Sequence, residues 1–131
     1  MNKDLIIQNR KRVYSINRNS ARLLKEINAD VSYVEIAYTM IFSTLVYRVK
    51  PLIDKIVLYP EDKLFLHIRC LNKDCTGNGF YLMDEIERAI CLRQVVIGEK
   101  KCDGKEDRKY LESSGCSCLT TLKYMITPIF K

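Results

Sequence analysis

Residues 64–79 have the sequence LFLHIRCLNKDCTGNG, in which an alternating apolar run leads into a turn that carries two cysteines. Successive side chains of a β-strand point to opposite faces. The leucines and the isoleucine at even positions therefore share one face, which we expect to be dry, whereas Phe65 and His67 share a more polar face. The stretch predicts a strand that ends in a compact turn bearing Cys70 and Cys75.

The cysteines indicate a metal site. The chain has six of them, and in a reducing compartment clustered cysteines bind metal more often than they form disulfides. Cys70 and Cys75 are the firmest predicted ligands, and Cys102 and Cys118 complete a set of four thiolates for tetrahedral zinc. Cys116 is the alternative to either of the last two. The competing interpretation is a set of free thiols used for packing, or a redox pair among them.

A closed site of four cysteines is structural, because catalytic zinc keeps one position open for water. The cysteine-bearing half of the chain resembles a zinc-ribbon or zinc-knuckle module, although its cysteine spacing departs from the usual pair of C-x2-C motifs. The resemblance implies a small β-structure held by one zinc ion. Cys91 lies between apolar neighbours and is expected to be a small buried hydrophobic residue instead of a ligand.

Residues 51–131 are predicted to form a β-β-α-loop-β region. Ile56 to Tyr59 and Leu64 to Ile68 have the pattern of a hairpin around a Pro-containing turn. A short helix follows over Asp84 to Gln94, then a polar loop over Gly98 to Cys118, and Leu119 to Ile126 alternates as a third strand.

Residues 1–50 are predicted to be helical. Residues 3–27 fit one amphipathic helix with an apolar stripe and a cationic face. Asn17 and Asn19 compete for backbone hydrogen bonds, so the alternative is a break near them. Ser32 and Glu35 have the spacing of a capping box, which predicts a second helix that ends before Pro51. β-branched and aromatic residues in this segment also suit a strand, but its three- and four-residue spacing favours a helix. We therefore expect an α+β protein, one compact unit in which a helical pair packs on a small three-stranded antiparallel sheet with a zinc-ribbon- or knuckle-like cysteine site.

Positive charge gathers in the first helix. The chain has 22 Lys and Arg against 16 Asp and Glu, a net charge of +6, and residues 1–30 contribute +4 of it, from seven basic and three acidic residues. The cationic arc of the helical wheel predicts five candidate nucleic-acid contacts: Arg10, Lys11, Arg18, Arg22 and Lys25. Tyr14 lies in the same arc, where it is placed to stack on a base. The alternative is an ordinary solvated helix face.

No catalytic motif is recognisable: the chain lacks phosphate-binding loops, dinucleotide fingerprints, zinc-protease motifs and nucleophile elbows. The sequence therefore predicts a zinc-stabilised nucleic-acid-binding or regulatory module and no enzyme. The alternative is a protein-interaction module, such as an inhibitor or adaptor of a phage or mobile element, which includes pairing as a homodimer. No signal peptide or membrane span is recognisable, so we expect a cytoplasmic protein with no membrane partner.

Overall fold

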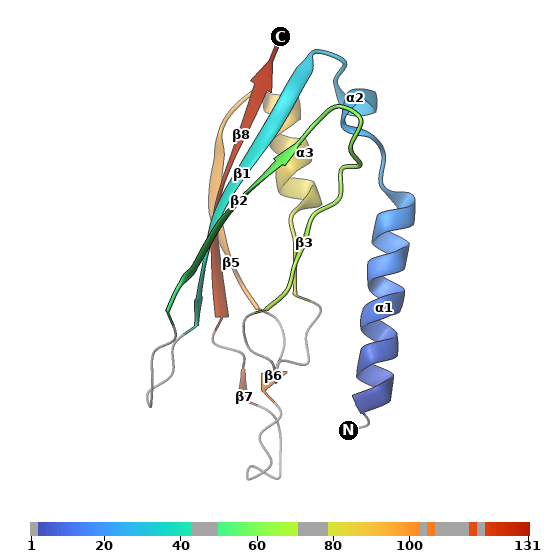
Figure 1. Ribbon diagram of the computed structural model, residues 1–131, viewed down its shortest axis with the longest axis vertical. Helices are drawn as coiled ribbons and strands as arrows, with labels where there is room; N and C mark the ends of the chain where they lie inside the picture. The colour runs from blue at the N-terminus through green and yellow to red at the C-terminus, as the bar shows by residue number, and fades with distance from the viewer. Residues whose placement is uncertain (1–2, 43–49, 71–78, 103–104, 107–115, 118–119) are drawn as a thin grey trace.

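The computed structural model describes residues 3–42, 50–70, 79–102, 105–106, 116–117 and 120–131. Its centre is an antiparallel sheet of four strands in the order β2-β1-β8-β5, with α3 on one face and α1 running alongside (Figure 1). The sheet strands are β1 (Val31–Phe42), β2 (Leu52–Leu58), β5 (Val96–Lys101) and β8 (Thr120–Phe130). The helices are α1 (Lys3–Ser20), α2 (Leu24–Ile27) and α3 (Met83–Leu92). Two small pairs complete the described elements: β3 (His67–Ile68) with β4 (Phe80–Tyr81), and β6 (Lys105–Glu106) with β7 (Cys116–Ser117).

The core lies between the sheet and α3. Even-numbered residues of β1 and β8 point to the same side, and Ile36 faces Ile126 across the two strands while Met40 faces Leu122. These four side chains are fully buried. β-branched and large apolar residues suit the pleated surface of a central strand, and each buried one contributes about 1.5–3 kcal/mol of transfer free energy. This alternation fixes the register, because a slip of one residue would turn the apolar set to solvent.

Helix α3 closes the core and has a defined end. Its buried residues Ile86, Ala89 and Ile90 recur at the three- and four-residue spacing of one helix face. Arg93 adopts a left-handed conformation (φ 53°), and its N–H donates to the carbonyls of the last helical turn. The Arg93 guanidinium also lies 4.5 Å from the centre of the Phe130 ring, so a single residue both terminates α3 and ties it to the end of β8.

A break separates α1 from α2. The Ser20 hydroxyl donates to the Ile16 carbonyl at 2.8 Å, and the following residues leave the helix and pair with another segment. The Leu24 N–H donates to the Asp62 carbonyl at 2.9 Å, and the Leu64 N–H donates to the Arg22 carbonyl. One helix over residues 3–27 is therefore wrong, because tertiary hydrogen bonds to residues 62–64 replace those of the helix after Ser20. The break lies close to Asn17 and Asn19, where the alternative placed it.

The predicted three-stranded sheet is also wrong, although the mixture of helix and sheet is confirmed. The segment predicted as a second helix forms β1, which pairs along its length with both β2 and β8. Its apolar residues also fit a helical period because Ala37 and Ile41, on the outer face, add to the buried even-numbered ones. The helix near residues 84–94 and the last strand are confirmed by α3 and β8.

The predicted hairpin does not form. Ile56 belongs to β2 and pairs with β1, whereas Ile68 belongs to β3 and pairs with β4. The start of the predicted polar loop at Gly98 lies instead in β5, an edge strand of the main sheet. The dry face expected of the even positions from Leu64 to Ile68 is confirmed, since all three are buried.

The zinc-ribbon- or knuckle-like architecture is wrong as well. The segment that follows Cys70 connects β3 to β4, which pair antiparallel outside the main sheet. The described ranges contain no group of three or more His, Cys, Asp or Glu residues that could hold a metal ion. None of the described helices is both long and apolar enough to cross a bilayer.

Candidate functional site

Helix α1 contacts the body of the protein through one narrow face. Its half-buried residues include Arg10, Val13 and Asn17, which lie within one arc of the helix. The Asn17 side chain hydrogen-bonds the side chain of Tyr81. The Lys63 ammonium donates to the Arg18 carbonyl at 3.3 Å near the end of α1, where the helix dipole favours a cation.

This inward face is rotated from the predicted apolar stripe. Leu5 and Ile16 belong to that stripe, yet they are 62% and 56% exposed. Arg10, predicted as a nucleic-acid contact, lies on the inward side and is half-buried. The sequence pattern of an isolated helix cannot fix which side docks, because polar contacts such as that of Asn17 with Tyr81 also orient it.

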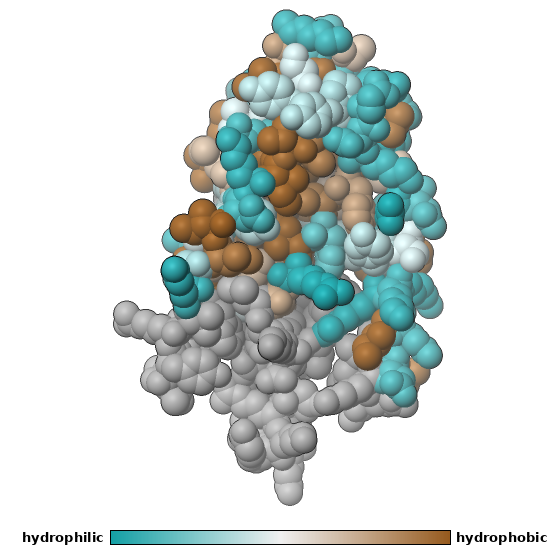
Figure 2. Space-filling view, viewed as in Figure 1, coloured by the Kyte–Doolittle hydropathy of each residue, from teal (hydrophilic) through white to brown (hydrophobic). Residues whose placement is uncertain are grey.

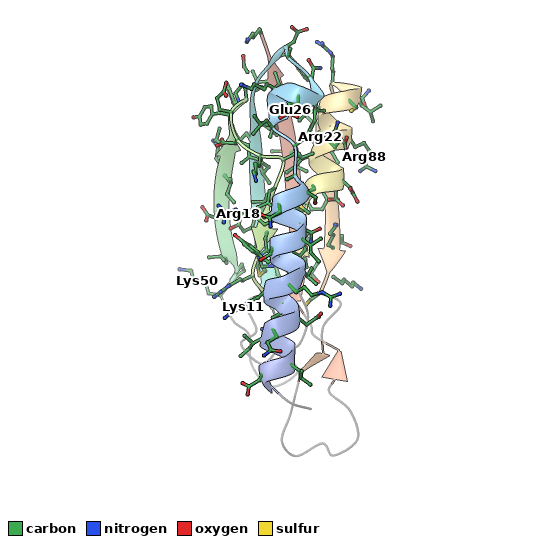
Figure 3. The ribbon with its side chains drawn as sticks, turned by 90° about the vertical axis from the view of Figure 1, so that its right-hand side faces the viewer. Lys11, Arg18, Arg22, Glu26, Lys50 and Arg88 are labelled. Atoms are coloured by element: carbon green, nitrogen blue, oxygen red, sulfur yellow. The ribbon has the colours of Figure 1, made fainter. Side chains whose placement is uncertain are left out.

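Lys11 and Arg18 are the predicted basic residues that α1 presents to solvent. They lie seven residues apart, project from the same side of the helix (Figure 3) and are both exposed. Arg12 is exposed on another side of α1. Within the parts of the chain that the structure describes, none of these three side chains forms an ion pair. Figure 2 shows hydrophilic side chains over most of α1, beside apolar ones on the body.

Arg22 and Lys25 differ from these residues, because each has an acidic partner. The Arg22 guanidinium lies 2.7 Å from the Glu87 carboxylate on α3, and the Lys25 ammonium lies 2.7 Å from the Glu61 carboxylate. Both pairs are solvent-exposed, so they contribute at most about 1 kcal/mol each to stability. The two acidic partners do, however, neutralise the charge of two of the five residues predicted to contact nucleic acid.

Four aromatic rings meet beside α1. Tyr14 contacts Phe65 and His67 edge-to-face, with ring centres 5.0 and 5.6 Å apart. Tyr81 contacts the same two rings at 6.2 and 4.5 Å. Burial raises the pKa of Tyr81, and the nearby Tyr14 adds to the rise while the Asn17 hydrogen bond opposes it. The alternation of residues 64–68 predicts that Phe65 and His67 share one face. Their contact with Tyr81 could not be predicted, because it depends on the pairing of β3 with β4.

Two of the four predicted zinc ligands meet at one residue. The Cys70 thiol lies 3.1 Å from the Thr120 hydroxyl, and the Cys102 N–H donates to the Thr120 carbonyl at 3.0 Å. Thr120 is fully buried and Cys102 is buried. Cys75 and Cys118 lie outside the described residues, as does the side chain of the alternative ligand Cys116. The prediction that Cys91 is buried is wrong, since its side chain is exposed on α3.

The outer face of the sheet, which points away from α3, carries exposed apolar side chains. Ile53 on β2 is 75% exposed and Ile97 on β5 is 73% exposed, and Met125 on β8 lies next to Ile97. Two pairs of opposite charge lie on this face, and Lys101 lies there opposite Thr121. Lys55 lies 2.8 Å from Glu35, and Glu99 is the cross-strand neighbour of Lys123.

No protein-family model matches the chain, and no curated protein or solved structure is significantly similar to it.

Proposed function

We propose that the protein is a small regulatory module that binds nucleic acid through the solvent-facing basic side chains of α1, and that it is not an enzyme. The observation that carries this proposal is the contrast in charge pairing. Lys11, Arg12 and Arg18 are exposed without an acidic partner among the described residues, whereas Arg22 and Lys25 are paired. Unpaired guanidinium and ammonium groups on one helix are suited to neutralise phosphates.

The proposal predicts how strongly the binding affinity depends on salt concentration. Each neutralised phosphate contributes roughly −0.7 to −0.9 to the slope of log affinity against log salt, so three contacts predict a fall of about 20- to 40-fold between 50 and 200 mM salt. Fluorescence anisotropy with labelled oligonucleotides measures this slope. Binding that is unchanged over this range would exclude phosphate neutralisation as its source.

Two double variants of equal charge test the assignment. Lys11→Gln with Arg18→Gln removes two charges that have no acidic partner among the described residues, and Arg22→Gln with Lys25→Gln removes two charges that are paired. We expect the first variant to lose at least about tenfold in affinity and the second to lose much less, because its positive charges are already neutralised. Equal losses would show that only net charge matters and would contradict a defined site on α1.

As part of the same proposal, Cys70, Cys75, Cys102 and Cys118 bind one structural zinc ion. The contacts of Cys70 and Cys102 with Thr120 support it, because they bring two thiol-bearing residues from distant segments to the residue that follows closely after Cys118. A zinc ion there would cross-link the chain and would not take part in a reaction. A cytoplasmic location, where thiols stay reduced, belongs to this proposal.

Native mass spectrometry tests the zinc ion. We expect one zinc per chain, lost in Cys70→Ser and in Cys75→Ser but kept in the control Cys91→Ser, whose side chain is exposed on α3. Because metal binding adds directly to folding free energy, both ligand variants should also be strongly destabilised. A metal-free wild-type protein from zinc-replete cells would refute this part and leave the α1 proposal untouched.

The second candidate function is a protein-interaction module of the inhibitor or adaptor kind, and the outer sheet face supports it. Ile53 and Ile97 are largely exposed, so this face presents an apolar surface that no described element covers. The occupant that best fits is a second copy of the chain. Four of the charges on this face form two pairs of opposite sign, Lys55 with Glu35 and Lys123 with Glu99. Helix α1 lies on the other side of the sheet, so two copies could meet without bringing their basic helices together (Figure 1). Light scattering that gives a monomer at high concentration would exclude this dimer.

A further inference from the structure

The aromatic rings beside α1 are more accessible than a core cluster would be. Tyr14 is 36% exposed, and Phe65, His67 and Tyr81 are only partly buried. Three of the four contacts among these rings are edge-to-face and the fourth is tilted. An edge-to-face contact covers the edge of one ring and only one face of the other. These contacts therefore do not cover both faces of every ring in the cluster.

Basic side chains flank Tyr14 on its own helix. Lys11 precedes it by three residues and Arg18 follows it by four, so the three side chains form one row along α1. At 1.5 Å per residue, the two cationic residues lie about 4.5 and 6 Å along the helix axis on either side of Tyr14. The row places an aromatic ring between two cationic side chains, both of them exposed.

An aromatic ring between two cationic side chains is better suited to bind a single strand than a duplex. A single-stranded nucleic acid offers unstacked bases to aromatic side chains and phosphates to basic ones, which is how many single-strand-binding proteins work. A duplex keeps its bases stacked inside, so it can use the lysine and arginine but not the tyrosine. The contribution of Tyr14 should therefore depend on the form of the nucleic acid.

We propose that the row of Lys11, Tyr14 and Arg18 is a binding site for single-stranded nucleic acid, with a base stacked on Tyr14 against the rings of Phe65 and His67. The inference rests on the proposed function and narrows it to one substrate class. The phosphates beside the stacked base contact Lys11 and Arg18. His67 and Phe65 support the Tyr14 ring from β3 and the segment before it.

Affinity measurements on two Tyr14 variants test the stacking. Tyr14→Leu keeps an apolar, helix-favouring side chain without a ring, and Tyr14→Phe keeps the ring. With 12-nucleotide oligo(U) and oligo(dT) as probes, stacking of about 1–3 kcal/mol predicts that Tyr14→Leu weakens binding by roughly 5- to 150-fold. Tyr14→Phe should stay within about twofold of the wild type. Binding of a 12-base-pair duplex should change in neither variant.

Tyrosine fluorescence gives a measurement that does not depend on the leucine variant folding. The chain has eight Tyr and no Trp, so its emission comes from tyrosine. A base stacked on Tyr14 should quench part of this emission when oligo(U) binds, and the conservative Tyr14→Phe variant should lose that part while it still binds. Equal quenching in the two proteins would overturn the stacking.

The outcomes separate this inference from the proposed function. If the Lys11→Gln, Arg18→Gln variant loses affinity for single strands and duplexes alike while Tyr14→Leu loses none, the α1 proposal stands and the single-strand site is wrong. If the wild-type protein binds none of the three probes, both are wrong.

Discussion

Replacement of Gly98 by Ala tests the pairing of β5 with β8, which places Gly98 directly opposite Tyr124. A Cβ atom added at Gly98 would lie 2.5 Å from the Tyr124 hydroxyl oxygen and 2.8 Å from the ring carbon that bears it. Favourable contact between such atoms needs about 3.5–4.0 Å, so the ring has to move by roughly 1 Å. Tyr124 is buried, so it has little free space in which to move.

The expected cost follows from these distances. Overpacking of a filled core costs about 1–3 kcal/mol, and loss of the conformational freedom of glycine in the unfolded chain returns roughly 0.4–1 kcal/mol. We expect Gly98→Ala to lower the free energy of unfolding by about 1–2 kcal/mol, which corresponds to a fall of roughly 4–8 °C in Tm for a chain of this size. Urea unfolding followed by circular dichroism measures the change.

A double-mutant cycle isolates the contact. In a Tyr124→Val background the ring is absent, so Gly98→Ala should become neutral or slightly stabilising, with a coupling energy of about 2 kcal/mol. Ile97→Ala is the neighbouring control. Its side chain points away from the core, and its replacement should cost less than about 0.5 kcal/mol. The reasoning fails if Gly98→Ala has the same effect in both backgrounds, because β5 would then not place Gly98 against Tyr124.

Three further predictions concern the core, the thiols and alkaline pH. Ile90→Ala should cost about 2–4 kcal/mol, since the side chain is fully buried under the sheet, and a urea midpoint close to the wild type would contradict the packing of α3. The exposed Cys91 should react quickly with a thiol reagent in the native protein and the buried Cys102 slowly, as peptide mapping after brief labelling can check. Burial, the charge of Asp54 and a hydrogen bond to it raise the pKa of Tyr38 above 10.0. The stability that depends on neutral Tyr38 is thus complete below about pH 10 and is lost as pH rises further, because the unfolded chain ionises first. The wild type should therefore lose more stability than Tyr38→Phe between pH 9 and 11, and parallel losses would argue against this effect.

Local signals predicted some elements well. Helix α3 has acidic residues in its first turn and one apolar face, and both features act within the helix itself. The last strand and the dry face of residues 64–68 follow from alternation, which also needs only neighbouring residues. The basic character of α1 is fixed by composition, so the presence of exposed Lys11 and Arg18 was predictable.

Other parts depended on contacts between distant residues. β1 buries its even-numbered residues from Val34 to Met40 and leaves those between them half-buried, but Ala37 and Ile41 on the outer face also give the segment a helical spacing. Only its pairing with both β2 and β8 decides for a strand. Gly98 weakens the local signal of β5, and its place in the sheet becomes clear only opposite Tyr124. The rotation of α1 depends on the rings of Phe65 and His67, which come from a different part of the chain.

The sequence by itself determined the mixture of helix and sheet, the amphipathic and basic first helix, and the short helix under the sheet. Each of these depends on propensity, periodicity or charge within a few turns of backbone. Only the tertiary structure decided which strands pair, which side of α1 faces solvent, and which basic residues are neutralised by Glu61 and Glu87. Those outcomes depend on side chains far apart in sequence, whose free energy of contact exists only after the chain has folded.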